Sequence, residues 1–489
     1  MPLLHVTARS GAPEETAADT RVVGLFEGES LADERLQRLV DLGEAKPGLK
    51  KVAVAHEDAP GGGQRRVLIA GLGKRGELDA ERARVAAAAV AARAKELGAV
   101  SLSWAVPDGD GVAAGLHEPS VAAGLVEGTL LKLYSFDRFK EPKGDDNGGI
   151  ESLEVVGGDK AEVEGARVAA DAANAARDLQ NLPSNFATPT FLAERAGEIA
   201  DQYDDLELEL LDGDAIVARG MGAFAAVAQG AHEDPRLIVL RYRPTGATGP
   251  HLAFVGKAVT FDTGGISIKP AAKMQEMKFD MSGGAAVIEA TGAIARLGLP
   301  VTLTAVVPST ENMPSGHAVK PGDIVTALNG KTIEVNNTDA EGRLILADAL
   351  AYAVEQGAER IVDLATLTGA VLFALGHTYA GLWSNDDAWF EQVRDASDAS
   401  GEIGWRMPLH PEYFDLTKGT VADLQNAAEA RVAQSNYAAE FLRQFVDDRP
   451  WVHVDIAGTA WGMSRNYVGK GASGFGTRML IELARRAAS

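Results

Sequence analysis

Side chains that could do chemistry gather in one part of the sequence, at the expected ends of strands and starts of helices. They are the carboxylates Asp262, Asp280, Asp339 and Glu341 and the cations Lys257, Lys269 and Arg343. Carboxylates that converge without compensation repel one another strongly. Hard divalent cations are the usual remedy, because carboxylate oxygens suit them as ligands. Two metal ions about 3.5–4 Å apart, bridged by one or two carboxylates, fit this set better than a single ion.

Each of these residues also has a simpler interpretation when it is taken alone. Asp280 and Asp339 precede apolar helical runs, so either could be an N-cap that accepts backbone hydrogen bonds. Glu341 could complement a helix dipole, and Lys257 alone is typical of a solvated strand end. The metal hypothesis is favoured because the four carboxylates lie on three strand–helix junctions of one expected sheet. Junctions at the same end of a sheet can converge in space.

Apolar strand-like runs alternate with helical stretches along the chain. Asn329-Gly330 indicates a two-residue hairpin turn within 324–336. The alternation predicts an α/β fold with a mainly parallel sheet covered on both faces. Ligand sites in such sheets lie beyond the carboxyl ends of the strands, where the carboxylates fall. Strands are expected at 66–70, 99–105, 153–156, 251–259, 301–307 and 361–364, and helices at 77–98, 160–181, 280–297 and 341–356.

The length of 489 residues exceeds what one core usually supports, so two domains are expected. A Gly- and Asp-rich break at 143–149 precedes a long Ala-rich helix, and Pro183 ends that helix. We therefore place a small N-terminal α/β domain at 1–159 and a linking helix at 160–182. A larger C-terminal α/β domain, with a central mainly parallel sheet flanked by helices, is placed at 183–489.

The composition excludes several classes of protein. The 69 acidic residues outnumber the 47 basic ones, and the net charge of −22 disfavours a nucleic-acid-binding protein, which normally needs a basic face. The absence of cysteine excludes disulfides, thiolate zinc sites and a cysteine nucleophile. Neither a secretory signal nor an apolar stretch of about 18 residues is visible, so a cytoplasmic protein without a membrane segment is expected.

Other motifs offer weaker signals. A G-x-G-x-x-G pattern at 71–76 follows an expected strand, but no acidic residue ends the next strand as a dinucleotide site requires. A tight strand–helix turn is the simpler interpretation. The nine histidines are scattered without H-E-x-x-H, and His377 and His453 stand in apolar contexts typical of structural residues. No G-x-S-x-G nucleophile elbow occurs.

The carboxylate-rich segments closely resemble the leucyl aminopeptidase family, the two-metal cytosolic aminopeptidases of peptidase family M17. The N-T-D-A-E-G-R-L stretch at 337–344 matches the family signature, and the spacing of Lys257, Asp262, Lys269 and Asp280 matches its pattern. Further blocks agree in order at 177–185, 221–222, 365–370 and 455–461. The resemblance covers 160–489 and is looser over 1–159.

The resemblance implies an aminopeptidase that removes the first residue from peptides with a free amino terminus. It implies two divalent metal ions per subunit, manganese or zinc, that are bridged by Asp262 and Glu341. Asp280 and Lys257 would bind one ion only, and Asp339 would bind the other. Lys257 must be neutral to do so, which is feasible because burial and a nearby dication both lower a lysine pKa.

The resemblance also implies roles around the metals. Lys269 would polarise the substrate carbonyl and steady the oxyanion, and Arg343 would hold a bicarbonate-like anion that takes a proton from the attacking water. The domain at 183–489 would be the catalytic peptidase domain and would assemble as a homohexamer. Residues implied to contact the peptide substrate are Met277, Thr366, Leu367 and Gly369.

Departures from the family pattern are modest and alternatives stay open. The stretch 430–436 stands where the family is often glycine-rich, and Ser473 where Thr is common, but neither touches a metal position. A two-metal phosphatase could use the same carboxylates and would cleave a phosphoester rather than an aminoacyl anilide. A DNA-binding accessory role, which some relatives have, is disfavoured by the acidic charge. An inactive scaffold is not expected, because every implied metal and catalytic position is present.

Overall fold

The structure is a computed structural model, and it describes residues 4–107, 119–141 and 149–488. The break expected at 143–149 lies outside these residues except for its last position. The chain forms two compact units: Met1–Asp171 with Ser464–Gly469, and Ala172–Met463 with Lys470–Ser489. The division falls inside helix α4 (Lys160–Asn181), the helix expected to link two domains. The return of the chain to the smaller unit at Ser464–Gly469 was not expected from the sequence.

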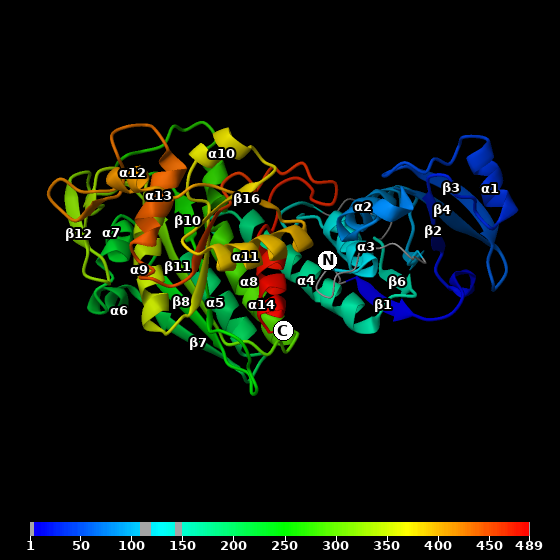
Figure 1. Cartoon of the computed structure of the whole chain (residues 1–489), viewed down its shortest axis with the longest axis horizontal. Coiled ribbons are helices and arrows are strands. Elements are labelled where there is room, and N and C mark those ends of the chain that lie inside the picture. The colour runs from blue at the N-terminus through cyan, green and yellow to red at the C-terminus, as the bar shows by residue number, and fades with distance from the viewer. Residues whose placement is uncertain (1–3, 108–118, 142–148, 489) are drawn as a thin grey trace. The chain divides into compact units, whose positions relative to one another are not determined.

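The smaller unit (blue to cyan in Figure 1) contains one sheet with helices. Its strands are β1 (His5–Arg9), β2 (Thr20–Phe26), β3 (Val52–Asp58), β4 (Gln64–Gly73), β5 (Ser101–Ala105) and β6 (Ser152–Val156). Its helices are η1 (Pro13–Glu15), α1 (Glu34–Asp41), η2 (Arg75–Glu77), α2 (Ala80–Glu96), α3 (Val121–Leu133) and the first half of α4, where η marks a 3₁₀ helix. The strand order is β1-β6-β5-β2-β4-β3, and only β3 runs antiparallel to its neighbour.

Of the glycines at 71–76 in this unit, Gly71 serves packing, and Gly73 has a positive φ of 76°. A Cβ on Gly71 would lie 2.2 Å from the carbonyl oxygen of Gly48, so only glycine allows the two backbones to approach. Helix α2 begins at Ala80, after η2, and its N-cap is the Asp79 side chain. The glycine turn therefore does not open directly into a helix as a dinucleotide loop does. Because η2 lies between β4 and α2, the connection is also longer than the tight strand–helix turn expected from the sequence.

The larger unit is built on a nine-stranded sheet. Its strands are β7 (Leu206–Leu211), β8 (Arg236–Tyr242), β9 (Leu252–Gly256), β10 (Ala258–Asp262), β11 (Leu303–Asn312), β14 (Arg360–Ala365), β15 (Ala380–Ser384), β16 (Gly404–Arg406) and β18 (Trp451–Asp455). The order is β16-β15-β18-β14-β9-β11-β8-β7, and β10 also pairs with β11. The strands from β10 and β11 through β9 and β14 to β18 are parallel, and the antiparallel pairs lie toward the edges. A separate small sheet contains β12 (Asp323–Thr326), β13 (Thr332–Val335) and β17 (Leu424–Gln425).

Helices cover both faces of this sheet, as the sequence predicted. One face is covered by α5 (Pro189–Ala200), α8 (Ser282–Arg296), α11 (Asp387–Ser400) and α14 (Thr477–Ala487). The other face is covered by α7 (Gly222–Ala228), α9 (Gly342–Glu355) and α13 (Gln434–Arg443) (Figure 1). The remaining elements are η3 (Met274–Met281), α6 (Gly213–Ala218), α10 (Ala370–Leu375) and α12 (Pro411–Asp415). The central strands are buried on both faces, which explains their continuous apolar sequences. The predicted α/β fold is confirmed.

Three local differences from the sequence expectation matter for the site. The strand expected at 251–259 is two strands, β9 and β10, with Lys257 between them. The strand expected to end at Val307 continues to Asn312. The helix expected to start at Asp280 starts at Ser282, because Asp280 belongs to η3. A hairpin is present at Asn329-Gly330, with β12 antiparallel to β13, but the two strands are joined by residues 327–331 rather than by the two-residue turn expected.

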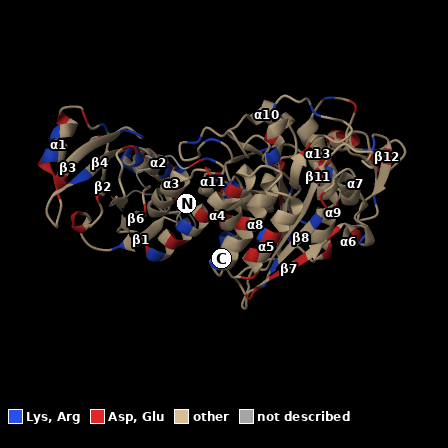
Figure 2. Ribbon diagram, turned by 180° about the vertical axis from the view of Figure 1, so that it is seen from behind, with Lys and Arg blue, Asp and Glu red and all other residues tan. Residues whose placement is uncertain are grey.

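Charged residues of both signs are interspersed along the ribbon in the view of Figure 2. Among the described residues, no helix is both long enough and apolar enough to span a bilayer.

Glycines let helix α8 sit directly on the sheet. A Cβ on Gly283 would lie 2.1 Å from the Leu364 carbonyl oxygen, and a Cβ on Gly256 would lie 2.6 Å from the Gly283 carbonyl oxygen. The Gly284 amide donates to the Lys257 carbonyl oxygen at 2.8 Å. This contact seats η3, and Asp280 with it, beside Lys257.

Gly283→Ala should therefore lower the free energy of unfolding of the larger unit by about 1–3 kcal/mol, since the methyl group forces α8 off β14. Gly197→Ala in α5 is the matched control, because its Cβ meets nothing closer than 3.7 Å; it should stabilise by about 0.4–1 kcal/mol. Urea unfolding followed by the fluorescence of the buried tryptophans measures both. Equal midpoints for the two variants would contradict the packing argument.

Candidate active site

The expected residues meet at the carboxyl ends of the parallel strands. Strand β10 ends at Asp262, which pairs in register with Asn312 at the end of β11. Strand β14 ends at Ala365, which pairs with Asp455 at the end of β18. The segment that carries Asp339 and Glu341 precedes α9, and η3 brings Asp280 to the same place. The structure thus brings together six of the seven charged residues singled out above. Arg343, the seventh, lies in the first turn of α9, two residues after Glu341.

Lys257 is buried between two of the carboxylates. Its Nζ lies 2.8 Å from Asp280 and 2.9 Å from Glu341, and it donates to the Thr366 carbonyl oxygen at 3.0 Å. A Cβ on Gly342 would lie 2.7 Å from this Nζ, so the glycine of the signature makes room for the lysine. Burial lowers the pKa of Lys257, but the carboxylates outweigh it and raise that pKa above its ordinary value.

Lys269 contacts the other two carboxylates. Its Nζ lies 2.7 Å from Asp262 Oδ2 and also pairs with Asp339. The side chain is 21% exposed, so it forms the accessible edge of the cluster. Burial acts to lower the pKa of Lys269, but Asp262 above all raises it over its ordinary value.

The carboxylates are held closer together than their charge favours. Oxygens of Asp262, Asp280 and Glu341 all lie within 4.8 Å of one another, and all three residues are buried. Burial raises the pKa of Asp262, that of Asp280 to about 8, and that of Asp339 to about 6. Burial also acts upward on Glu341, but the two lysines hold its pKa below the ordinary value.

None of these carboxylates caps α8 or α9 through its side chain. The N-caps of α8 and α9 are Met281 and Glu341, and neither makes a side-chain capping bond. Asp280 Oδ2 and Asp339 Oδ1 are buried and, within the described part of the chain, accept no well-aligned hydrogen bond although each lies against an ammonium group. Two lysines facing four carboxylates leave two negative charges in excess when all are ionised. Such a buried set of oxygen donors fits hard divalent cations.

Asn312 was not singled out from the sequence. Its side-chain amide donates to Asp262 Oδ1 at 2.8 Å and to the Thr338 carbonyl oxygen at 3.0 Å, and it lies 3.5 Å from Glu341. The Gly264 amide also donates to Asp262 Oδ1, at 2.8 Å. These bonds leave the other oxygen, Oδ2, to face Lys269. No signal in the sequence marks it, because the apolar run of β11 ends at Val307 and a polar stretch leads from Pro308 to Asn312.

Arg343 is buried but forms no ion pair among the described residues. It donates to the carbonyl oxygen of Asn426, its guanidinium lies 5.2 Å from the ring centre of Tyr437, and its Nε has no acceptor there. A buried guanidinium with a free donor beside a cation site can hold an anion.

The loop after β14 carries three of the four residues implied to contact substrate. Thr366 donates from its hydroxyl to Asp280 Oδ1 at 2.6 Å, Leu367 is half-buried, and Gly369 is exposed at the start of α10. Met277 is half-buried in η3. The two histidines act structurally, as expected. His453 pairs with Asp363 at 2.6 Å, and His377 bonds the Gly458 carbonyl oxygen at 2.7 Å.

Comparison with known proteins agrees with this arrangement. Residues 174–481 match the family model for the catalytic domain of the cytosol aminopeptidase family, and residues 22–143 match the model for its N-terminal domain. The chain therefore belongs to the cytosol aminopeptidase family, as the sequence resemblance predicted.

Relatives match over nearly the whole length. A probable cytosol aminopeptidase of Solibacter usitatus is 45% identical over 98% of this chain and 99% of its own, and one of Roseiflexus castenholzii is 43% identical over 99% of both. A solved structure of the bottromycin maturation enzyme BotP in complex with Mn is 35% identical, with a TM-score of 0.86 over 97% of this chain and 100% of its own.

Asn312→Ala should weaken Mn²⁺ binding by about 10–100-fold, the usual cost of losing a partner that orients a metal ligand. Isothermal titration of the metal-free protein measures this. The control is Asn385→Ala, because Asn385 also bridges backbone groups, Arg449 and Trp451, but at the other end of β18. Unchanged Mn²⁺ affinity in Asn312→Ala would show that Asp262 needs no such support.

Proposed function

We propose that this protein is a metal-dependent aminopeptidase that hydrolyses the first residue from peptides with a free amino terminus. The carrying observation is the buried group formed by Asp262, Asp280 and Glu341. Lys257 is buried between Asp280 and Glu341, and Lys269 and Asp339 lie at the edge of the group. The names of the relatives and the manganese complex of BotP support the same activity. Hydrolysis of aminoacyl anilides, but not of a phosphoester, by metal-reloaded protein tests it against the phosphatase alternative.

The residues fit two divalent ions, manganese or zinc. Asp262 and Glu341 stand between the two lysines and would bridge the ions. Asp280 and Lys257 would hold one ion, and Asp339 the other. When bound, such a pair of ions supplies a water of lowered pKa and a Lewis acid for the carbonyl. Lys257 would give up its ion pairs and its proton to serve as a ligand.

Lys269 and Arg343 are the candidates for the chemical steps. Lys269 lies at the accessible edge, where its ammonium would stabilise negative charge on the carbonyl oxygen of the substrate. Arginine stays protonated and cannot act as a base. Its fork can hold a bicarbonate-like anion, which would take the proton from the attacking water. Met277, Thr366, Leu367 and Gly369 would position the substrate.

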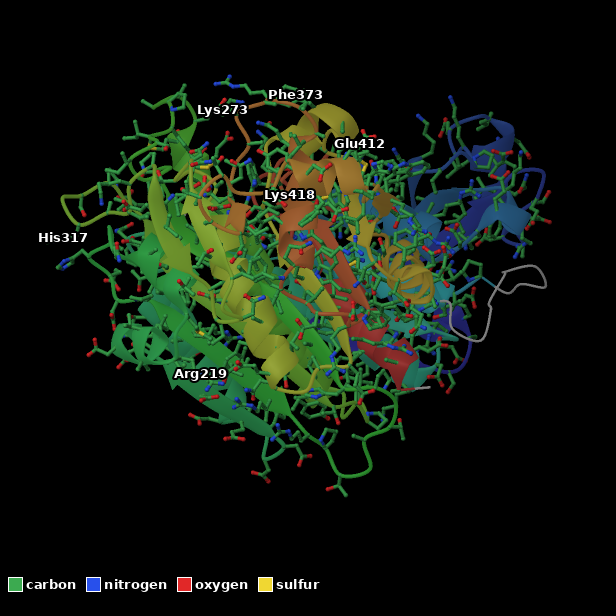
Figure 3. The ribbon with its side chains drawn as sticks, turned by 60° about the vertical axis from the view of Figure 1, so that its left-hand side comes forward. Arg219, Lys273, His317, Phe373, Glu412 and Lys418 are labelled. Carbon is green, nitrogen blue, oxygen red and sulfur yellow. The ribbon has the colours of Figure 1, made fainter. Side chains whose placement is uncertain are left out.

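We further propose a cytoplasmic homohexamer without nucleic-acid or membrane partners. The word cytosol in the names of the relatives supports the location. Phe373, which projects from α10 (Figure 3) and is 95% exposed, is a side chain that such an assembly would bury. Sedimentation of an active monomer near 51 kDa would refute the assembly.

Metal analysis should find two ions per chain in active protein and one in each of Asp280→Asn and Asp339→Asn, because each variant loses a ligand of a different ion. Asp348→Asn is the control: Asp348 is buried in α9, and its carboxylate accepts from the backbone amides of Phe224, Leu328 and Ala223 rather than facing the cluster. It should keep both ions. Full activity in exhaustively chelated wild type would contradict the proposal.

Arg343→Ala should lower kcat with a modest change in KM, and added bicarbonate should stimulate wild type but not this variant. Lys269→Ala should lower kcat by about 10²–10³, the usual cost of losing an oxyanion donor, without abolishing the bicarbonate response. Steady-state kinetics in bicarbonate-free buffer make the comparison. An Arg343→Ala enzyme that keeps wild-type kcat there and still responds to bicarbonate would rule out the anion role.

A further inference from the structure

Asp455 is a fully buried carboxylate that binds the loop following the neighbouring strand. Its Oδ1 accepts from the Leu367 amide at 3.1 Å, and its Oδ2 accepts from the Thr368 amide at 3.1 Å and the Thr368 hydroxyl at 2.6 Å. The Ala457 amide adds a fourth bond to Oδ1 at 3.1 Å. Consecutive amides of one loop are thus tied to the two oxygens of one carboxylate.

These bonds determine where the loop's carbonyl groups point. In a trans peptide the N–H and the C=O point in opposite directions. The peptide that joins Thr366 to Leu367 shows this directly, since its N–H reaches Asp455 while its carbonyl oxygen accepts from Lys257 at 3.0 Å. The next peptide donates its N–H to Asp455 as well, so the Leu367 carbonyl also points away from Asp455, toward the side of the lysine–carboxylate cluster.

We infer that Asp455 is a positioning residue for the reaction: it holds two successive peptide units so that both carbonyl oxygens face the catalytic cluster. This rests on the proposed function, in which Thr366 and Leu367 contact the substrate. A loop without this anchor could flip the peptide between Leu367 and Thr368 and present an N–H where the substrate requires an acceptor.

Asp363 provides the contrast that separates positioning from mere stability. It is equally buried, it lies on adjacent strand β14, and its carboxylate bonds Trp451 Nε1 and His453 Nδ1, both at 2.6 Å. Its partners lie in the core rather than in the loop. Substitution of either aspartate disturbs a buried polar network, but only Asp455 touches the loop amides.

The test compares Asp455→Asn with Asp363→Asn in metal-loaded protein. An asparagine at 455 has one acceptor oxygen instead of two, so in either orientation its NH₂ group faces the Leu367 N–H or the Thr368 N–H and one of the two loop bonds is lost. We expect kcat/KM on an aminoacyl anilide to fall about 10²-fold through kcat, the usual cost of a misplacement of about 1 Å, with metal content unchanged. Asp363→Asn should lower Tm but keep kcat/KM within about threefold.

The outcomes separate this inference from the proposed function. If the metal-loaded wild type cleaves no aminoacyl substrate, the proposed aminopeptidase activity is wrong. An active wild type with Asp455→Asn and Asp363→Asn equally close to wild-type kcat/KM overturns the positioning role alone. Amide hydrogen exchange in wild type adds a test that needs no variant: Leu367 and Thr368 should exchange slowly although they lie outside helices and strands, and rapid exchange would overturn the inference.

Discussion

The constraint on which the structure depends is the convergence of four carboxylates, three of them buried, with only two lysines to compensate them. Asp262, Asp280 and Glu341 lie within 4.8 Å of one another at the buried end of the sheet. Desolvation and mutual repulsion both oppose this arrangement, and the raised pKa of Asp280 expresses the cost. Bound cations would offset this electrostatic cost, and carboxylate oxygens are the ligands that hard divalent metals prefer. The cluster is therefore best explained as a site for divalent metal ions.

The surrounding structure holds this costly group in place with neutral donors and close packing. Gly283 lets α8 meet the sheet, Asn312 fixes one oxygen of Asp262, and Thr366 donates to Asp280. None of these contacts adds charge. They orient the carboxylates, so the remaining charge stays available for cations. Asp455 orients the loop as an acceptor, since it draws the N–H groups of Leu367 and Thr368 away from the cluster and leaves the carbonyl groups facing it.

Much of the site could be predicted from the sequence because its charged residues stand next to glycines at strand–helix junctions. Local pattern could not show which cap-like aspartates face inward, since Asp280 and Asp339 look the same as N-caps until the sheet brings their partners near. Asn312 and the loop-binding role of Asp455 depend on strand register between segments far apart in the chain. The split at Lys257 and the return of Ser464–Gly469 to the smaller unit are likewise set by tertiary contacts.

The most direct test of this account is a crystal of the manganese-loaded protein measured at the manganese absorption edge. The account predicts two anomalous peaks per chain, one between Lys257 and Asp280 and one beside Asp339, with Asp262 and Glu341 reaching both. A single peak, or peaks away from these carboxylates while the crystals retain activity, would contradict the claim that the buried charge exists to hold two metal ions.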